Sequence, residues 1–228
     1  MLTHALPEVL RRLDNAARDA GRPPPRLLAV GKLQPAEAIA RLAGAGQRAF
    51  GENYVQEAVA KQDALGPAAE GLEWHLIGHL QSNKAALAAS RFDWIQTVDR
   101  AKLVPLLARA RPAGRGPLNV LIQVNVDDEA SKHGCRPDEI GTLADAIRTH
   151  PALVLRGLMA IPAPLPDPGR RRAAFARMRA LFDALAARHA TVDTLSMGMS
   201  DDLELAIAEG STMVRVGTAL FGVRPQRG

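Results

Sequence analysis

The chain has 228 residues, of which 47% are hydrophobic and 23% are charged, proportions that are ordinary for a globular protein. Its net charge of +5 comes from 29 basic and 24 acidic residues spread along the chain, and only 4% of the residues are aromatic. Because the densest basic run, Gly169–Arg172, has few aromatic neighbours, we interpret it as a solvated helix face and not as a nucleic-acid site.

Residues 1–21 predict an amphipathic helix. Its apolar stripe consists of Leu6, Val9, Leu10, Leu13 and Ala17. The charged-then-apolar order of a signal peptide is missing here, and no apolar run approaches the ~18 residues of a membrane span. We therefore expect a cytoplasmic protein without membrane attachment. The single cysteine, Cys135, excludes an intrachain disulfide, and no cluster with metal-ligand spacing is recognisable in the sequence.

Short apolar or β-branched runs then alternate with helical patterns along the chain. The expected strands lie within residues 26–32, 48–51, 73–78, 92–99, 119–127, 153–161, 194–199 and 213–222. Helices are expected to begin near Pro35, Asn53, Ser82, Arg100, Pro137, Gly169 and Asp202, with Ser82 as an N-cap. The helix after Gly169 has a stripe that we assign to the core, made of Phe175, Met178, Leu181, Phe182 and Leu185.

Strands that alternate with helices in this way predict an α/β fold with a parallel sheet. Eight parallel strands close naturally into a (β/α)₈ barrel, and we predict one such TIM barrel as a single domain over residues 1–228, with the N-terminal helix as an extra element. An open doubly wound sheet is the alternative, but no G-x-G-x-x-G follows the first strand. Residues 161–169 are interpreted as a strand-to-helix loop and not as a linker between domains.

In such barrels, functional groups gather at the C-terminal ends of the strands, and the loops after strands seven and eight often bind phosphate. Ser200 offers a hydroxyl group at a helix start after the seventh strand. Gly217 and Thr218 follow the eighth, where a glycine lets the backbone approach an anion closely. These residues predict a phosphate site, although a tight turn with a surface serine and threonine would give the same pattern.

Lys32 stands directly after the first strand. Lysine occurs only at positions 32, 61, 84, 102 and 132, which leaves 24 arginines among the 29 basic residues. A desolvated lysine becomes a nucleophilic amine that forms a Schiff base, whereas arginine does not. A side chain that extends from a strand end into solvent is an equally good interpretation of this stretch alone.

Arg215 lies two residues before Gly217 and is expected to point into the mouth of the barrel. An inward arginine needs an acceptor, and the ring nitrogen of a pyridoxal phosphate would supply one. A guanidinium does not keep that nitrogen protonated as a carboxylate would. The ring would then be a weaker electron sink.

Several motifs together resemble one family, the pyridoxal phosphate homeostasis proteins. They are LLAVGK, FGENYVQE, WHLIGHLQSNK, GLMAIP and SMGMSDDLELAIAEGSTMVRVGTALFG, and they cover nearly the whole chain in order. The resemblance implies a barrel similar to the N-terminal domain of alanine racemase, with pyridoxal 5'-phosphate held on Lys32 as a Schiff base. By the same resemblance, Ser200, Gly217 and Thr218 bind the phosphate and Arg215 faces the ring nitrogen.

The resemblance further implies ring-side contacts from Asn53 and Met159, with His79 and Ser196 as further neighbours of the cofactor. Relatives commonly carry serine at the position of Gly31, so a hydrogen bond from that side chain is missing here. His75 alternates with apolar residues and is expected to be a core or rim histidine and not a ligand.

Three residues of the loop after the fifth strand have an open role. Glu129, Lys132 and His133 either line the barrel mouth or are solvated, and we favour the mouth. Cys135 has no partner in the sequence that marks it as a nucleophile.

Two function classes remain open, a carrier of the cofactor and an enzyme such as an amino-acid racemase. A two-base racemase needs an acid or base on each face of the substrate, and related racemases take a tyrosine from a second domain. The only tyrosine here is Tyr54 and the chain stops eleven residues after Gly217, so we expect a carrier. The expected partners are the cofactor itself and apo-enzymes that receive it, and we expect a monomer. A Schiff-base aldolase acting on a phosphorylated sugar is a third hypothesis.

Overall fold

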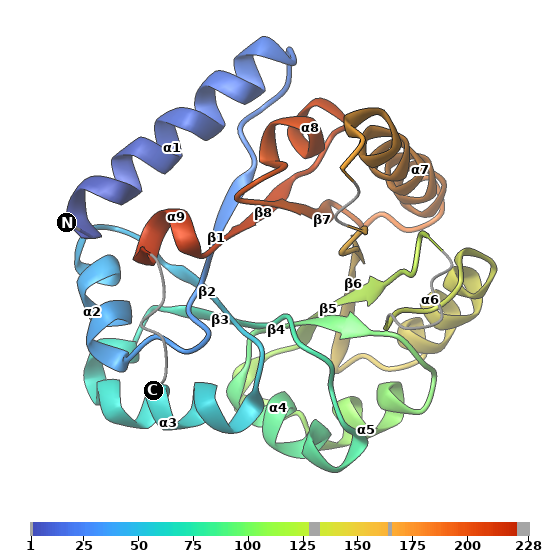
Figure 1. The fold of residues 1–228 in the computed structure, drawn as a ribbon. Coiled ribbons are helices and arrows are strands. Elements are labelled where there is room, and N and C mark those ends of the chain that lie inside the picture. The colour runs from blue at the N-terminus through green and yellow to red at the C-terminus, as the bar shows by residue number, and fades with distance from the viewer. Residues whose placement is uncertain (1, 128–132, 164–165, 223–228) are drawn as a thin grey trace.

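Eight parallel strands close into a barrel in the computed structural model, which describes residues 2–127, 133–163 and 166–222 (Figure 1). Neighbours in the sequence are neighbours in the sheet, and β1 pairs with β8 to complete the ring. The strands are β1 (Arg26–Val30), β2 (Ala49–Glu52), β3 (Glu73–Leu76), β4 (Trp94–Val98), β5 (Leu118–Gln123), β6 (Leu153–Met159), β7 (Thr194–Met199) and β8 (Met213–Val216). The predicted (β/α)₈ barrel is confirmed.

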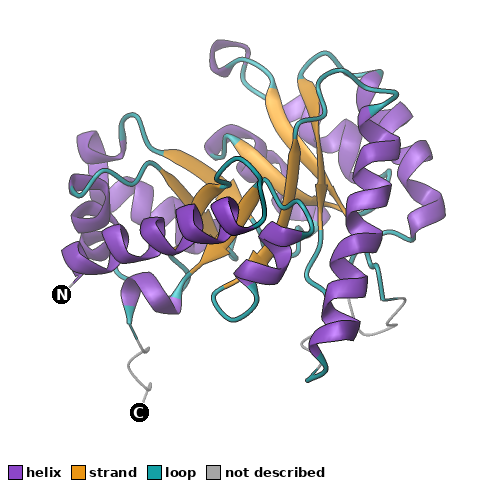
Figure 2. Ribbon diagram, turned by 90° about the horizontal axis from the view of Figure 1, so that it is seen from above, coloured by secondary structure: helices purple, strands orange, loops and turns teal. Residues whose placement is uncertain are grey.

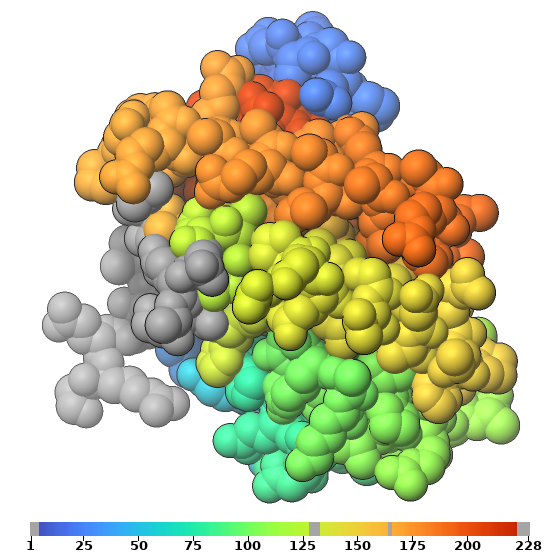
Figure 3. All heavy atoms as spheres, turned by 90° about the vertical axis from the view of Figure 1, so that its right-hand side faces the viewer, coloured from blue at the N-terminus to red at the C-terminus, as the bar shows by residue number. Residues whose placement is uncertain are grey.

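Helices surround the barrel, and α2 to α8 each connect one strand to the next (Figures 1 and 2). They are α2 (Ala36–Gly44), α3 (Val55–Leu65), α4 (Ala85–Arg91), α5 (Leu103–Ala110), α6 (Ile140–Arg148), α7 (Pro168–Ala186) and α8 (Leu203–Ala208), with α1 (Leu2–Asp19) before β1 and α9 (Thr218–Phe221) after β8. Short 3₁₀ turns cover 66–69, 82–84, 113–115 and 137–139. Figure 3 shows the side chains of α6 and α7 covering one flank.

The strands are buried on both faces, which explains their nearly continuous apolar runs. All five residues of β4 are buried, for example. On α7, the stripe that the sequence predicts lies in the core, except that Leu181 is only half-buried. On α1 the predicted stripe is buried except for Leu10, which is 43% exposed because it lies at the edge of the apolar face.

The structure differs from the prediction at several boundaries, two of which bear on the site and its neighbouring helices. The eighth strand ends at Val216, the last residue that pairs with β1, and Thr218–Phe221 form the short helix α9. Ser82 is not an N-cap, because it begins a 3₁₀ turn and α4 starts only at Ala85, with no side-chain cap at either start. Among the described residues, no helix is long and apolar enough to span a membrane.

Candidate functional site

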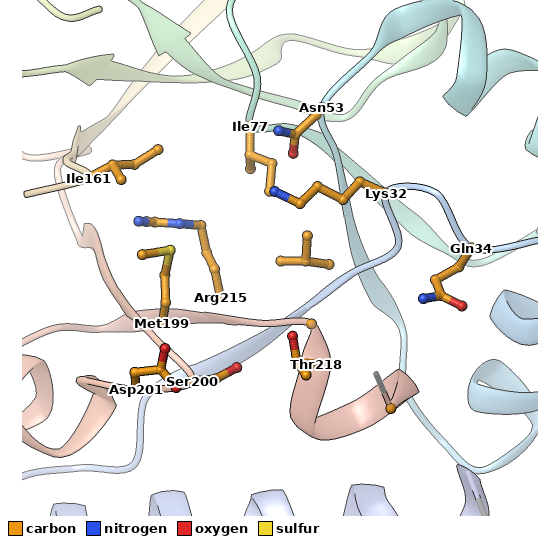
Figure 4. Close-up of a pocket in the computed structure, with 13 residues that line it drawn as sticks. Lys32, Gln34, Asn53, Ile77, Ile161, Met199, Ser200, Asp201, Arg215 and Thr218 are labelled. Carbon is orange, nitrogen blue, oxygen red and sulfur yellow. The ribbon is translucent and has the colours of Figure 1, made fainter. Parts of the chain in front are cut away.

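A cavity of about 340 Å³ opens at the C-terminal ends of the strands (Figure 4). Most of the residues predicted to bind a cofactor line it, namely Lys32, Asn53, Ser200, Arg215, Gly217 and Thr218. The rest of its described wall is formed by Val30, Gln34, Ile77, Ile161, Met199, Asp201 and Gly222. The cavity therefore combines a lysine, an arginine and two hydroxyl groups with apolar side chains.

Lys32 reaches the cavity from a tight turn at the end of β1, and Figure 4 shows its side chain pointing inward. The Gly31 amide still continues the sheet by donating to the Gly51 carbonyl at 2.9 Å, and the Gln34 amide closes the turn onto the Gly31 carbonyl at 2.9 Å. Leu33 has a φ of +63°, a left-handed conformation that is uncommon for a residue other than glycine. Such a turn needs support from its surroundings.

The support comes from Lys61, a lysine that the sequence analysis gave no role. Its ammonium group is buried, with 6% of the residue exposed, and it donates to the Gly31 carbonyl at 2.6 Å, to Glu52 Oε1 at 2.7 Å and to Glu57 Oε1 at 2.7 Å. Glu57 Oε1 also accepts from the Leu33 amide at 2.5 Å. The turn that carries Lys32 is thus held on both sides by one ionic cluster.

Because Gly31 has no side chain, the Glu52 carboxylate of this cluster can occupy the space beside it. A Cβ atom at Gly31 would lie 2.6 Å from Glu52 Oε1 and 2.6 Å from Ile39 Cδ1. Gly31 is therefore packed against the Glu52 carboxylate. Burial raises the pKa of Glu52 to about 7, although the charge of Lys61 and its hydrogen bond act in the opposite direction.

Arg215 is buried in the cavity wall, where it donates from Nη1 to Ser196 Oγ at 2.7 Å and from Nη2 to the Ala160 carbonyl at 2.8 Å. Burial lowers the pKa of Arg215 to about 10, against the charge of Asp202. The guanidinium therefore stays cationic at neutral pH, and its two bonds fix the orientation of its plane.

Ser196 is the first step of a polar column that runs down the barrel axis. Its hydroxyl donates to Gln96 Oε1 at 2.7 Å, Gln96 Nε2 donates to His75 Nδ1 at 2.9 Å, and His75 Nε2 bonds to Glu73 Oε1 at 2.7 Å. Since Nδ1 accepts, the proton of a neutral imidazole is on Nε2 and faces Glu73. Burial lowers the pKa of His75, which agrees with this neutral form. His75 is fully buried, so of the two predicted places, core and rim, the structure shows the core.

Two hydroxyl groups mark one end of the cavity. Ser200 lies in the turn after β7, which is closed by the Met199 amide donating to Asp202 Oδ1 at 2.7 Å. Thr218 begins α9, directly after Gly217. In Figure 4, Ser200 and Thr218 lie at the end of the cavity opposite Asn53. Hydroxyl groups beside a glycine and a helix start are suited to an anion, because the first amides of a helix have no partner within it.

The structure does not bring three of the predicted residues to the described cavity wall. Met159 is fully buried against Trp94 and Leu121, and Ser196 lies behind Arg215. His79 lies in a neighbouring depression beyond Asn53. Met159 is the last residue of β6 and His79 follows β3, whereas Ser196 lies inside β7, and in each case the direction of the side chain was not readable from the pattern.

The loop after β5 was assigned to the mouth. Within it, His133 is exposed and stacks on His79, whereas Glu129 and Lys132 lie outside the described residues. Cys135 is buried, and burial raises the pKa of its thiol to about 12, so that the thiolate is scarce at neutral pH. The apolar wall residues Ile77 and Ile161 were missed, although each lies at or next to the C-terminal end of a predicted strand.

A family model described as alanine racemase, N-terminal domain, matches residues 5–225. Among curated proteins, the pyridoxal phosphate homeostasis protein of Pseudomonas aeruginosa is 52% identical over 95% of this chain and 93% of its own length. The protein of the same name from Escherichia coli K12 is 51% identical, over 98% and 97% of the two chains. The chain belongs to the family of the pyridoxal phosphate homeostasis proteins.

Solved structures of family members have the same fold. PipY of Synechococcus elongatus with pyridoxal phosphate bound is 36% identical, has a TM-score of 0.83, and the match covers 97% of this chain and 100% of PipY. Alanine racemase of Corynebacterium glutamicum is 20% identical with a TM-score of 0.66, and only 62% of that chain is covered. The match between the racemase and this chain therefore shows only that the two proteins share the barrel fold.

Proposed function

We propose that this chain binds pyridoxal 5'-phosphate and serves the homeostasis of that cofactor, holding it on Lys32 as a Schiff base. The observation that carries the proposal is one cavity in which a lysine, a buried arginine and two hydroxyl groups meet. Relatives that are named for pyridoxal phosphate homeostasis, and a solved relative with the cofactor bound, support the same conclusion.

The residues present fit such a cofactor. Lys32 supplies the amine, and Asn53 and Ile77 lie at the end of the cavity toward which Lys32 points (Figure 4). The hydroxyl groups of Ser200 and Thr218 and the backbone at Gly217 are suited to the phosphate. When bound, the cofactor supplies an electron-withdrawing ring, and Arg215 can donate a hydrogen bond to the ring nitrogen but cannot accept its proton.

We propose a carrier in preference to an enzyme. The relatives are named as homeostasis proteins, which favours this choice over a racemase. In the structure Tyr54 is 60% exposed and is not among the described residues that line the cavity, so it does not face Lys32 across the site. We further propose that the protein acts in the cytoplasm as a monomer and delivers the cofactor to apo-enzymes.

Borohydride reduction tests the tether. Full-length protein incubated with pyridoxal phosphate is expected to turn yellow, and reduction followed by peptide mass spectrometry should place the pyridoxyl group on Lys32. The variant Lys32→Ala should lose the visible absorption, whereas Lys102→Ala, which removes an exposed lysine outside the described cavity wall, should keep it. An unchanged spectrum and affinity in Lys32→Ala would overturn the assignment.

Turnover is tested separately. Racemisation or decarboxylation of an amino acid at about 1 per second or faster, a normal enzymatic rate, would overturn the carrier proposal while leaving the Lys32 tether intact. A protein that stays colourless with pyridoxal phosphate but cleaves a phosphorylated sugar would support the aldolase hypothesis instead.

A further inference from the structure

Three loops at the mouth of the barrel bring His79, Asp99 and His133 together beside the cavity. His79 follows β3, Asp99 follows β4, and His133 returns toward β5. Each offers one ligand-type atom, and these atoms all lie within 4.8 Å of one another. His79 Nδ1 is 3.5 Å from Asp99 Oδ2, and the two imidazole rings stack with centroids 3.9 Å apart. No pattern along the chain marks this cluster, because its members are far apart in the sequence.

The backbone around His79 is fixed from both sides by the β4 end of the barrel. Thr97 Oγ1 donates to the Gly78 carbonyl at 2.9 Å, and Arg100 Nη2 donates to the Leu80 carbonyl at 2.8 Å. Arg100 also bonds through Nη1 to Asp99 Oδ1, while Oδ2 is the oxygen that faces His79. The Asp99 side chain is only 8% exposed. The Asp99 carboxylate and the backbone that carries His79 are therefore held in place before any ligand binds.

The backbone next to His133 is fixed as well. The Cys135 amide donates to the Gln123 carbonyl at 2.9 Å, and the Asn125 amide donates to the Cys135 carbonyl at 2.9 Å. Gly134 has a φ of +124°, and a Cβ atom there would lie 2.6 Å from the Asn125 amide nitrogen, so only glycine allows this close approach. The backbone directly after His133 is therefore fixed, whereas the side chain of His133 is exposed.

We propose that His79, Asp99 and His133 form a binding site for a divalent transition-metal ion of the zinc class. Two imidazoles and one carboxylate are ligands that Zn²⁺ prefers, and three protein ligands leave a position for water. A bound ion lies in the plane of each imidazole, so one ring must rotate out of the present stack, which is 16° from parallel. Both histidines are exposed enough for that rotation. The inference does not depend on the proposed function.

Calorimetric titration of the full chain with ZnCl₂, in buffer without pyridoxal phosphate, tests the site. We expect saturable uptake of one ion per chain. Asp99→Asn and His133→Ala should each weaken the affinity by at least about tenfold, the scale that even supporting residues of metal sites reach. The control His150→Ala removes a histidine after α6, outside this cluster, and should leave the affinity unchanged. Far-UV circular dichroism shows whether each variant is folded.

A second measurement uses the unaltered protein, so the proposal stays testable even if a variant does not fold. Co²⁺ added in place of Zn²⁺ should give a visible absorption band that excess Zn²⁺ removes. Absence of saturable Zn²⁺ uptake, absence of that band, or an unchanged affinity in either folded ligand variant would overturn the site. Loss of pyridoxal phosphate binding alone would bear on the proposed function and not on this site.

Discussion

Ser196 shows how a single residue acts through another. It lies behind Arg215, and its hydroxyl oxygen accepts a hydrogen bond from the Arg215 guanidinium. The same hydroxyl donates to Gln96, and Gln96 in turn donates to His75. Every donor in this column faces an acceptor, because buried polar groups that lack a partner are costly. A change of one member therefore affects the orientation of Arg215 in the cavity.

Ser196→Ala should lower the free energy of unfolding by about 1–3 kcal/mol, because it leaves Arg215 Nη1 without its acceptor and Gln96 Oε1 without its donor. It should also weaken binding of pyridoxal phosphate, since Arg215 loses one of the two bonds that orient it. Urea unfolding and a titration of the cofactor's absorbance measure the two effects. Ser90→Ala, on the exposed side of α4, is the matched control. Equal stability of the two variants would contradict the role of the column.

Glu52→Gln tests the raised pKa of Glu52. The folded pKa of about 7 exceeds the 4.5 of a free glutamate, so between these values the folded state keeps a proton that the unfolded state releases. This group therefore stabilises the fold fully below pH 4.5, and its contribution falls as the pH rises through 7, by up to about 1.4 kcal/mol per pH unit.

In Glu52→Gln that slope should be missing, as measured by urea unfolding across the range between the two pKa values of 4.5 and about 7. Glu37→Gln, an exposed position on α2, should keep the wild-type slope. If both variants show the same pH dependence, the Glu52 carboxyl does not titrate as proposed.

At the scale of elements, the turn between β1 and α2 depends on α3. Lys61 and Glu57 lie one turn apart on that helix, and together they bond the Gly31 carbonyl and the Leu33 amide on either side of Lys32. The helix thus sets the conformation of a turn that precedes it by one βα unit. This coupling also explains why a non-glycine residue can hold the left-handed conformation at Leu33.

Glu57→Ala should loosen this turn, because the Leu33 amide loses its acceptor. We expect faster hydrogen exchange of that amide in nuclear magnetic resonance spectra, and an affinity for pyridoxal phosphate weaker by roughly tenfold, the loss of about 1.4 kcal/mol that one such hydrogen bond contributes. Glu8→Ala, an exposed position on α1, is the control. A Leu33 amide that exchanges equally slowly in both variants would show that the turn is held by other means.

At the scale of the whole molecule, α1 is the element outside the repeating βα pattern. It packs against α8, α9 and α2 near the seam where β8 closes onto β1. Arg12 adds an ion pair to Glu204 on α8, with Nη2 2.8 Å from Oε2. The extra helix therefore covers the part of the barrel where the first and last strands meet.

Leu13→Ala should lower the free energy of unfolding by about 3 kcal/mol, the usual cost of such a cavity. Leu13 is 1% exposed, whereas Leu10 on the same helix is 43% exposed. Leu10→Ala should therefore change the stability by less than about 0.5 kcal/mol. Urea unfolding of the two variants gives the comparison, and similar losses in both would mean that α1 contributes little to the core.

The pattern of residues along the chain was enough to predict the barrel and the positions of its functional side chains. Strands in a parallel barrel are buried on both faces, so their apolar runs and the helices between them are visible along the chain. Because parallel strands end at one rim, residues such as Lys32, Ser200, Arg215 and Thr218, which are far apart in sequence, could be assigned to one mouth, and they line one cavity.

The directions of the side chains and the partners of their hydrogen bonds, by contrast, became visible only in the folded chain. Ser196 lies within β7 and Met159 ends β6, yet one supports Arg215 and the other is buried in the core. Lys61 donates a hydrogen bond to the turn after β1, and His79 stacks on His133. In both contacts the two partners come from segments that are separated by whole βα units. Such contacts carry no local pattern, because they depend on the closure of the barrel and not on the spacing of residues along any one element.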